Sequence, residues 1–261
     1  MKKNQEIKQY WDQKATTTKE YIPDITMKDI CLRELEIESI INLLKSYGLK
    51  DVIDIGCGNG YSTFRFNKYA QNILGVDYSE EMIKKCIENQ EMIADKNISF
   101  QSADVLELSE IVDKKFDVAI TERCLINVPN FEDQKLAITQ IHNVLNPKGK
   151  FLMLEGIQET FDYLNNARIK AGLDIIKLDW HNILFKTKEF ETYISDMFRI
   201  VQVIDFGVYY YISRIFHPLF VAPEEPKFTS KINEVARQLS ILGNPDFEKY
   251  SILKLYVLEK K

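Results

Sequence analysis

The 261-residue chain lacks any long hydrophobic run, since no stretch approaches the about 18 consecutive apolar residues that a membrane-spanning helix needs. Its first residues, MKKNQEIKQYWDQK, contain lysines but no apolar segment after them, which is not the pattern of a secretion signal. These two absences predict a soluble, cytoplasmic protein with no membrane partner.

Cysteine and histidine are also scarce, and negative charges outnumber positive ones. The four cysteines form no CxxC pair, so neither a disulfide framework nor a zinc site is indicated. The three histidines form no HxxxH pair, and we expect no metal. A net charge of -5 argues against nucleic acid as a partner, because nucleic-acid binders usually present a basic face. These absences favour a small-molecule ligand.

What the chain does have is a regular alternation of strand-length apolar runs and helix-length amphipathic segments. The pattern predicts helices over 29–47, 61–69, 79–89 and 133–145, and strands over 52–55, 72–76, 98–102, 116–121 and 151–154. Strict alternation of this kind is typical of an α/β fold, in which helices cover both faces of a mostly parallel sheet.

The last third of the chain departs from this alternation. Two further strands are expected within 198–206 and 251–261, which makes seven. Two irregular insertions, 158–197 and 207–250, flank the first of them and are expected over the carboxyl ends of the strands, where open α/β sheets bind ligands. We therefore predict a single domain over 1–261, with a core over 29–157 and an amino-terminal lid over 1–28.

A glycine-rich turn follows the first predicted strand, in VIDIGCGNGYS. Gly56, Gly58 and Gly60 stand between a strand and a helix, where a backbone without Cβ atoms can approach a ligand closely. The pattern is DxGxGxG, not the GxGxxG of dinucleotide binders, and no GK[ST] follows to make a P-loop. The turn therefore indicates a nucleoside-type ligand without a pyrophosphate.

Two carboxylates follow the next two strands. Asp77, in GVDYSEEM, can accept both hydroxyls of a ribose, and Asp104, in SADV, can accept a hydrogen bond from an adenine amino group. A glycine turn, a ribose carboxylate and an adenine carboxylate in this order fit an adenosine ligand.

The pieces VIDIGCGNG, GVDYSEEM, SADV, FDVAITERCLINV and VLNPKGKFLML resemble, in order and spacing, the class I S-adenosylmethionine-dependent methyltransferases. The resemblance implies a Rossmann-like fold with S-adenosylmethionine as cofactor. The cofactor-binding residues that it implies are Asp54, Gly56, Cys57, Gly58, Asn59 and Gly60 for the methionyl part, Asp77 and Tyr78 for the ribose, Asp104 and Val105 for the adenine, and Thr121 and Glu122 beside the transferred methyl group.

This chain departs from the family pattern at two places. The usual LxPGG turn appears as LNPKG, and Asn127 stands where many small-molecule members have a histidine. In many relatives the segment before the first strand covers the cofactor. Tyr10, Trp11 and Tyr21 are the candidates here, with ordinary packing as the alternative. Arg33 could pair with the cofactor's carboxylate, unless it only lies on a solvated helix face.

The insertions and the loop after the fourth strand should bind the methyl acceptor. Arg123, Arg168 and Arg214 stand among aromatic residues, which suggests an anion pocket, because guanidinium groups match phosphate and carboxylate. Alternatively, each arginine caps a helix or pairs with an acid. His181 and Glu155 are the candidate general bases. The other residues predicted to bind the acceptor are Trp180, Asn182, Tyr210 and Tyr211.

The pieces ERCLIN, LNNAR, WHN and YYYISR also resemble methyltransferases encoded with bacterial surface-polysaccharide genes. They favour transfer to an oxygen of a small anionic metabolite or glycan precursor, such as a phosphorylated, phosphoramidate or nucleotide-linked capsule intermediate. A phosphate or phosphoramidate oxygen would need no base, whereas a sugar hydroxyl would. Two alternatives stay open, a methyltransferase for protein or nucleic acid and a non-catalytic nucleoside-binding relative, and the chain could be a monomer or a homodimer.

Overall fold

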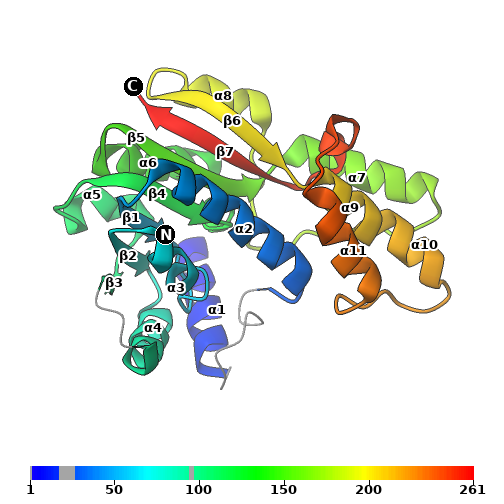
Figure 1. Cartoon of the computed structure of the whole chain (residues 1–261), viewed down its shortest axis with the longest axis horizontal. Coiled ribbons are helices and arrows are strands. Elements are labelled where there is room, and N and C mark those ends of the chain that lie inside the picture. Colours follow the sequence, from blue (N-terminus) through cyan, green and yellow to red (C-terminus); the bar gives the residue numbers. More distant parts are fainter. Residues whose placement is uncertain (1, 18–26, 94–96) are drawn as a thin grey trace.

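A seven-stranded sheet forms the centre of the molecule in the computed structural model, which describes residues 2–17, 27–93 and 97–261 (Figure 1). The strands are β1 (Asp51–Ile55), β2 (Asn72–Asp77), β3 (Ile98–Ser102), β4 (Phe116–Glu122), β5 (Leu145–Gly156), β6 (Phe198–Asp205) and β7 (Leu253–Lys260). Their order is β3-β2-β1-β4-β5-β7-β6, and β7 runs antiparallel to both of its neighbours. The predicted seven-stranded, mostly parallel sheet is confirmed.

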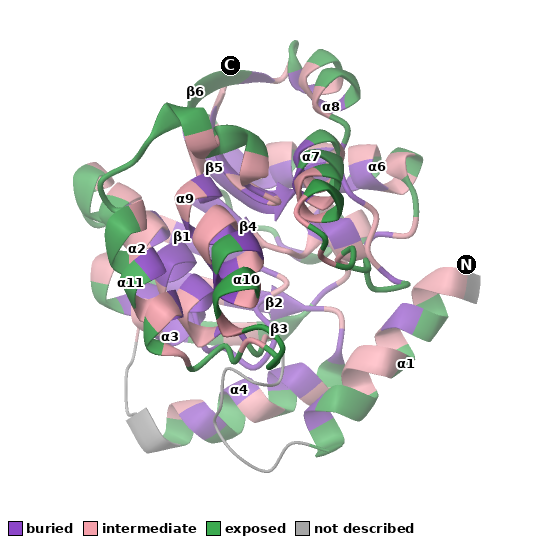
Figure 2. Cartoon of the chain, turned by 90° about the vertical axis from the view of Figure 1, so that its right-hand side faces the viewer, coloured by how far each residue is buried: buried purple, intermediate pink, exposed green. Residues whose placement is uncertain are grey.

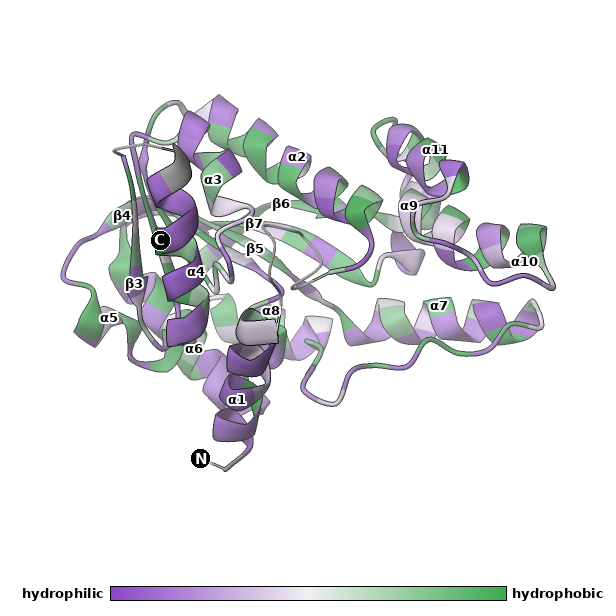
Figure 3. Cartoon of the chain, turned by 90° about the horizontal axis from the view of Figure 1, so that it is seen from below, coloured by the Kyte–Doolittle hydropathy of each residue, from purple (hydrophilic) through white to green (hydrophobic). Residues whose placement is uncertain are grey.

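Helices cover both faces of this sheet, with α2 on one side and α6 on the other in Figures 1 and 3. The helices are α1 (Lys2–Thr17), α2 (Ile30–Tyr47), α3 (Thr63–Phe66), α4 (Glu80–Ile93), α5 (Leu108–Ile111), α6 (Phe131–Val144), α7 (Gln158–Lys170), α8 (Thr187–Ile194), α9 (Gly207–Tyr211), α10 (His217–Val221) and α11 (Lys231–Ser240). Short helical turns are η2 (Asn67–Tyr69), η3 (Val105–Glu107), η4 (Leu125–Asn127), η5 (Ile212–Phe216) and η6 (Pro245–Tyr250). None of the described helices is long and apolar enough to cross a membrane.

The two faces are built from alternating residues of the same strands. Val52 packs in the apolar cluster that contains Ile40 of α2, whereas the next residue, Ile53, packs in the cluster that contains Ile138 of α6. This follows from the pleat, which points successive side chains to opposite faces. Burial on both faces explains why the strands have continuous apolar runs.

The ends of α2 are set by its flanking residues. The Asp29 carboxylate accepts a hydrogen bond from the Leu32 backbone N–H (3.2 Å) and caps the first turn. Gly48, with φ of 71°, ends the helix in a conformation that favours glycine. The helix thus delivers the chain directly into β1.

The two insertions contain more regular structure than the sequence suggested. The segment expected to be irregular after β5 begins with α7, and the second insertion folds into α9, η5, α10 and α11. These elements gather at one end of the sheet (Figure 1). The two insertions contact each other there, because the Arg168 guanidinium donates to the backbone carbonyl of Arg214.

Helix α1 lies beside α4 rather than against the sheet (Figure 2). Ala15 of α1 is fully buried against Met82 of α4. The Ser79 hydroxyl, just before α4, donates to the Asp12 carboxylate (2.5 Å). These contacts hold the amino-terminal helix next to the carboxyl end of β2.

Candidate functional site

A cavity of about 670 Å³ lies at the carboxyl ends of β1, β2 and β4. Its floor is formed by residues that follow these strands, among them Gly56, Asp77 and Glu122. Its other walls come from α1 and from both insertions, as predicted for segments above the strand ends. The arrangement brings most of the predicted site residues together.

The glycine turn forms the wall next to β1. Gly56, Gly58 and Gly60 have φ angles of 75°, 55° and 81°, a region where residues with a Cβ are strained. A Cβ on Gly56 would lie 2.5 Å from the Cys124 sulfur atom. Gly56, Cys57 and Gly58 line the cavity, whereas Asn59 and Gly60 lie behind it. The bare backbone therefore allows a ligand to approach closely.

Asp54 does not reach the cavity, although the sequence placed it on the methionyl part of the cofactor. Its carboxylate is buried and accepts a hydrogen bond from the Thr63 hydroxyl (2.6 Å). Burial raises the pKa of Asp54 to about 7. In this geometry it ties the end of β1 to the start of α3, on the two sides of the glycine turn.

Asp77 lines the cavity at the end of β2. Its carboxylate accepts hydrogen bonds from the backbone N–H groups of Gly58 (3.0 Å) and Ser79 (2.9 Å). Burial raises its pKa to about 6. Tyr78 also lines the cavity, and its buried hydroxyl has no hydrogen-bond partner among the described residues.

The wall beyond β3 contains the second predicted carboxylate. Asp104 accepts a hydrogen bond from the Leu106 N–H (3.0 Å) and so begins the turn η3. Asp104, Val105 and Leu106 all line the cavity. This wall combines an acceptor with apolar side chains, which suits a purine ring with an amino group.

A buried ion pair lies across the cavity from these carboxylates. The Arg33 guanidinium is 3.6 Å from the Glu122 carboxylate, and both side chains are nearly fully buried. The Arg33 Nε has no hydrogen-bond partner within the described part of the chain. Arg33 thus keeps a donor available for an anionic ligand group, and it is not on a solvated helix face.

The three arginines predicted to bind the acceptor do not converge. Arg168 is outside the cavity and binds two backbone carbonyls, those of Arg214 and Asp174. Arg123, with φ of 55°, lines the cavity but is paired with the fully buried Glu36 carboxylate (2.5 Å). Arg214 lines the cavity too and is paired with Asp29. The predicted three-arginine pocket is therefore wrong in its geometry.

Tyr210 and Tyr211 are separated by the turn of α9. Tyr210 is buried and lines the cavity, and burial raises the pKa of its hydroxyl above the usual value. Tyr211 points elsewhere and packs edge-on against Phe247 and Tyr250. Only Tyr210 can contact a ligand in the cavity.

His181 and Asn182 line the cavity from the first insertion. His181 is only 4% exposed, and its Nδ1 has no hydrogen-bond partner among the described residues. Burial lowers its pKa, so the imidazole is neutral at pH 7. Trp180, 52% exposed, does not line the cavity and packs edge-on against His181 from outside.

Glu155, the other candidate base, is also outside the cavity. It is fully buried, and its carboxylate accepts hydrogen bonds from the backbone N–H groups of Cys124 (3.1 Å), Leu125 (3.0 Å) and Ile126 (3.1 Å). It therefore shapes the loop after β4 and has no access to a substrate proton. Thr121 is likewise fully buried behind this loop, whereas its neighbour Glu122 reaches the cavity.

Helix α1 closes the cavity on the remaining side. Tyr10 and Trp11 line it, and their rings lie 4.9 Å and 5.7 Å from the His181 ring. The Trp11 indole N–H donates to the Asn127 side chain (3.3 Å). Tyr21, the third predicted lid residue, lies outside the described residues.

Sequence reasoning missed three residues that organise this site. Asp29 and Glu36 neutralise the cavity arginines, and Asn127 holds α1. The one available signal was the position of Asn127 where relatives have a histidine. Asp29 precedes α2 and Glu36 lies within it, and because this segment carries many charged residues, its sequence does not indicate which acids pair with the arginines.

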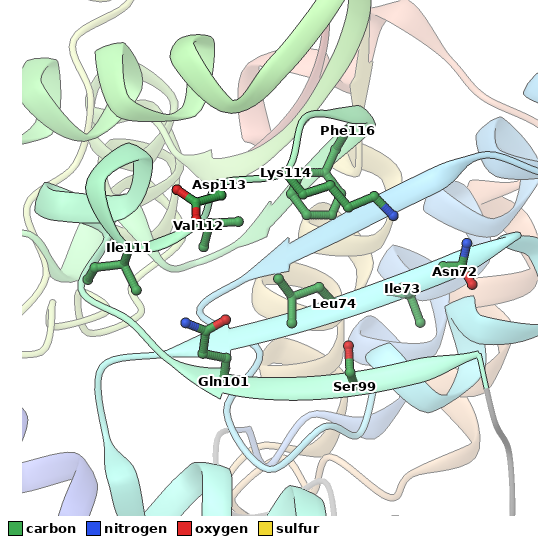
Figure 4. Close-up of a pocket in the computed structure, with 10 residues that line it drawn as sticks. All are labelled: Asn72, Ile73, Leu74, Ser99, Gln101, Ile111, Val112, Asp113, Lys114 and Phe116. Atoms are coloured by element: carbon green, nitrogen blue, oxygen red, sulfur yellow. The ribbon is translucent and has the colours of Figure 1, made fainter.

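A second hollow, of about 420 Å³, lies on the face of β2 and β3 next to α5 (Figure 4). Its lining includes Leu74, Gln101 and Ile111 and none of the predicted site residues. Lys114 at its edge is paired with Asp51 (2.8 Å). Across the described ranges, no group of three or more His, Cys, Asp or Glu side chains is placed to hold a metal ion.

Comparison with known proteins identifies the family. A family model described as a methyltransferase domain matches residues 46–207, more than half of the chain. The chain belongs to this methyltransferase family. Among curated relatives, phosphoethanolamine N-methyltransferase 1 of Triticum aestivum is 31% identical over 153 residues, which cover 57% of this chain and 30% of that protein. The chain thus spans about a third of that relative's length.

Solved structures confirm the class I methyltransferase fold. The N-methyltransferase NodS from Bradyrhizobium japonicum WM9, in complex with S-adenosyl-L-homocysteine, matches with a TM-score of 0.58 at 12% identity over 98% of both chains. Magnesium protoporphyrin IX methyltransferase from Synechocystis PCC 6803, with bound S-adenosylmethionine, matches with a TM-score of 0.60 at 13% identity, over 99% of this chain and 97% of that one.

The residues present fit S-adenosylmethionine, the ligand bound in the Synechocystis structure. The glycine turn leaves room for a ligand backbone, Asp77 and Asp104 offer acceptors for ribose and adenine, and the unpartnered Arg33 Nε suits the methionyl carboxylate.

Proposed function

We propose that this protein transfers the methyl group of S-adenosylmethionine to an oxygen of a small molecule, in the cytoplasm. The observation that supports an enzyme with a proton-bearing acceptor is His181, a buried and neutral imidazole in the wall of the cavity. A non-catalytic nucleoside-binding protein would not need a proton acceptor at this position. The bound cofactor supplies an electrophilic methyl group on a sulfonium.

The protein's own contribution is to position the acceptor and to exclude water. Tyr10 and Trp11 cover the cavity next to His181, and the buried pair Arg33–Glu122 closes its floor. With a proton on one ring nitrogen, neutral His181 can accept the acceptor's proton on the other. A hydroxyl group, which must lose its proton, fits this arrangement.

The geometry gives little support for an acceptor that must be anionic. Arg123 and Arg214 are each offset by a buried carboxylate, so the guanidinium groups offer hydrogen-bond donors without a net positive charge. Such donors bind neutral hydroxyl and carbonyl oxygens as well as anions. A sugar-like acceptor from surface-polysaccharide synthesis is compatible with this wall, and the capsule intermediate stays a prediction from sequence.

The acceptor class is testable with S-adenosylmethionine that carries ¹³C in its methyl group. The purified protein is incubated with a small-molecule extract of its source organism, and the product is examined by carbon NMR. We expect an O-methyl signal in the small-molecule fraction. An N-methyl signal, or label only in protein or nucleic acid, would contradict the proposal. N-methylation is the main alternative, because the similar proteins include N-methyltransferases.

Replacement of His181 tests the proton acceptor. In His181→Ala, kcat should fall by about 10²- to 10⁴-fold, and the acidic limb of its pH profile should disappear, because only neutral imidazole accepts a proton. His142→Ala is the matched control, since His142 also has a lowered pKa but packs against Phe198 away from the cavity. A loss that is small and independent of pH would assign His181 to substrate positioning.

A further inference from the structure

Large apolar side chains are exposed in a group at the end of the molecule that carries the insertions. We call this group the apolar rim, and its members are Ile169, Ile175, Leu178, Phe216, Phe220 and Phe228. Their exposed fractions lie between 38% and 68%. Isolated exposed apolar residues are normal, but a contiguous group usually marks a binding surface.

One hydrogen bond joins the two insertions that carry these residues. Arg168, next to Ile169 at the end of α7, donates to the backbone carbonyls of both Asp174 and Arg214. Ile175 adjoins the first of these partners, and Phe216 follows the second by two residues. Figures 1 and 3 both show α7 and α10 extending together from the same end of the molecule.

The apolar rim is continuous with the cofactor cavity. Leu178 and Phe228 belong to both, since they line the cavity and are 38% and 40% exposed. The Arg214 guanidinium lies 5.0 Å from the centre of the Phe228 ring and 5.8 Å from that of Tyr210. A path therefore runs from the partly exposed Phe228 ring, past the paired Arg214 guanidinium, to Tyr210 in the cavity wall.

The exposed helix at the rim has features of a surface that binds an apolar chain. Phe216 and Phe220 stack with ring centres 5.6 Å apart and are 49% and 68% exposed. Figure 2 shows α10 facing outward, with exposed residues along it. Covering such side chains contributes about 25 cal/mol per Å² of apolar surface removed from water.

We propose that the methyl acceptor is amphiphilic, with an apolar chain of the acyl or polyprenyl type that lies on the apolar rim while its polar end enters the cavity. This inference rests on the proposed small-molecule methyl transfer and specifies its substrate class. Continuity with the cavity favours a chain that belongs to the acceptor over a second protein on the same surface. The donor-rich, net-neutral wall at Arg123 and Arg214 suits an oxygen-rich polar end.

The probe for this site is dodecyl maltoside below its micelle concentration, which supplies a single apolar chain with an uncharged, oxygen-rich head. Calorimetric titration of the full chain, saturated with S-adenosylhomocysteine, should show binding. In the double variant Phe216→Ser, Phe220→Ser the affinity should fall about tenfold or more, because both phenyl rings leave the chain's contact surface. The matched control is Ile241→Ser, Leu242→Ser, which alters side chains that are 69% and 78% exposed after α11.

Several results would overturn the proposal. The first is that the monomeric probe does not bind, and the second is that both double variants lose the same amount of probe affinity. The third is that the protein co-sediments with phosphatidylcholine vesicles but does not bind probe monomers, which would indicate binding to a lipid surface. Self-association that the Phe216→Ser, Phe220→Ser variant abolishes would instead indicate a second copy of the chain. S-adenosylhomocysteine affinity and ¹³C-methyl transfer are measured on the same samples, so this inference can fail while the proposed methyl transfer stands.

Discussion

Asp77 connects the glycine turn to the cofactor. It anchors the backbone of Gly58 and Ser79 and faces the cavity with the rest of its carboxylate. Asp77→Ala should therefore weaken S-adenosylhomocysteine binding by about 2 to 4 kcal/mol, through the loss of charge-assisted hydrogen bonds. Calorimetry measures this, with the exposed Asp113→Ala as control. An affinity within twofold of the native value would refute the ribose assignment.

The same residue makes cofactor binding depend on pH. Burial raises the pKa of Asp77 to about 6, and only the ionised carboxylate can accept from both ribose hydroxyls. The affinity for S-adenosylhomocysteine should thus be constant above pH 7 and fall as the pH drops below about 6. Titrations from pH 5 to pH 8 test this, and Asp77→Asn should bind weakly with no step near pH 6. A step that persists in Asp77→Asn would assign it to another group.

At the scale of single residues, local patterns predicted many residues that line the cavity but not which acids pair with its arginines. Asp77 and Asp104 follow strands, and strand ends converge in any parallel sheet. The partner of Arg214 is Asp29, which is 185 positions away, and Arg123 meets Glu36 across 87 positions. Such pairs depend on how helices pack, and no local pattern encodes that. The arginines were therefore found without the acids that neutralise them.

Among the elements, helix α1 lines the cavity with Asn4, Tyr10, Trp11 and Lys14 and packs against α4. Ala15→Asp should place a charge against buried Met82 and release α1 from α4, because an unpaired buried charge is costly. Affinity for S-adenosylhomocysteine should fall about tenfold, on the order of 1.4 kcal/mol. Gln13→Asp, on the exposed side of the same helix, is the control. Equal affinities in the two variants would show that α1 does not contribute to cofactor binding.

Element types were predicted best where the apolar period was clear. Strands β1 to β4 and helices α2, α4 and α6 appear within a few residues of the expected ranges, whereas β5 begins six residues before the expected strand over 151–154. The sequence of α7, QETFDYLNNARIK, has a weak apolar period and therefore predicts an irregular segment, and the helix buries only Thr160 and Leu164. Its position comes from contacts with η5 and η6 instead. Helices fixed by tertiary contacts are the ones that periodicity misses.

For the whole molecule, the alternation of strands and helices predicted the sheet and the edge at which ligands bind. It could not predict how the two insertions meet, because their contact is made by Arg168 and a backbone carbonyl. The molecule also buries several carboxylates near its centre, among them Asp54, Asp77 and Glu155, and burial raises the pKa of each. Stability should therefore respond to pH through these groups.

Asp54 allows this response to be isolated. Its pKa is near 3.8 in the unfolded chain and about 7 in the folded one, so the folded state binds the extra proton between these values. The resulting stabilisation is present at low pH and is lost as the pH rises through about 7. His181 and His142, whose pKa values are lowered, act in the opposite sense, so the comparison must be made between variants.

Asp54→Asn keeps an oxygen for the Thr63 hydroxyl and removes the titrating group. Relative to this variant, the native chain should lose about 2 to 3 kcal/mol of unfolding free energy between pH 5 and pH 8. Urea unfolding at both pH values measures the difference. Equal changes of unfolding free energy in the two proteins would mean that Asp54 is ionised from pH 5 to pH 8. The buried Asp54 carboxylate would then need a positively charged partner, and Arg33, which is also close to Glu122, is the candidate.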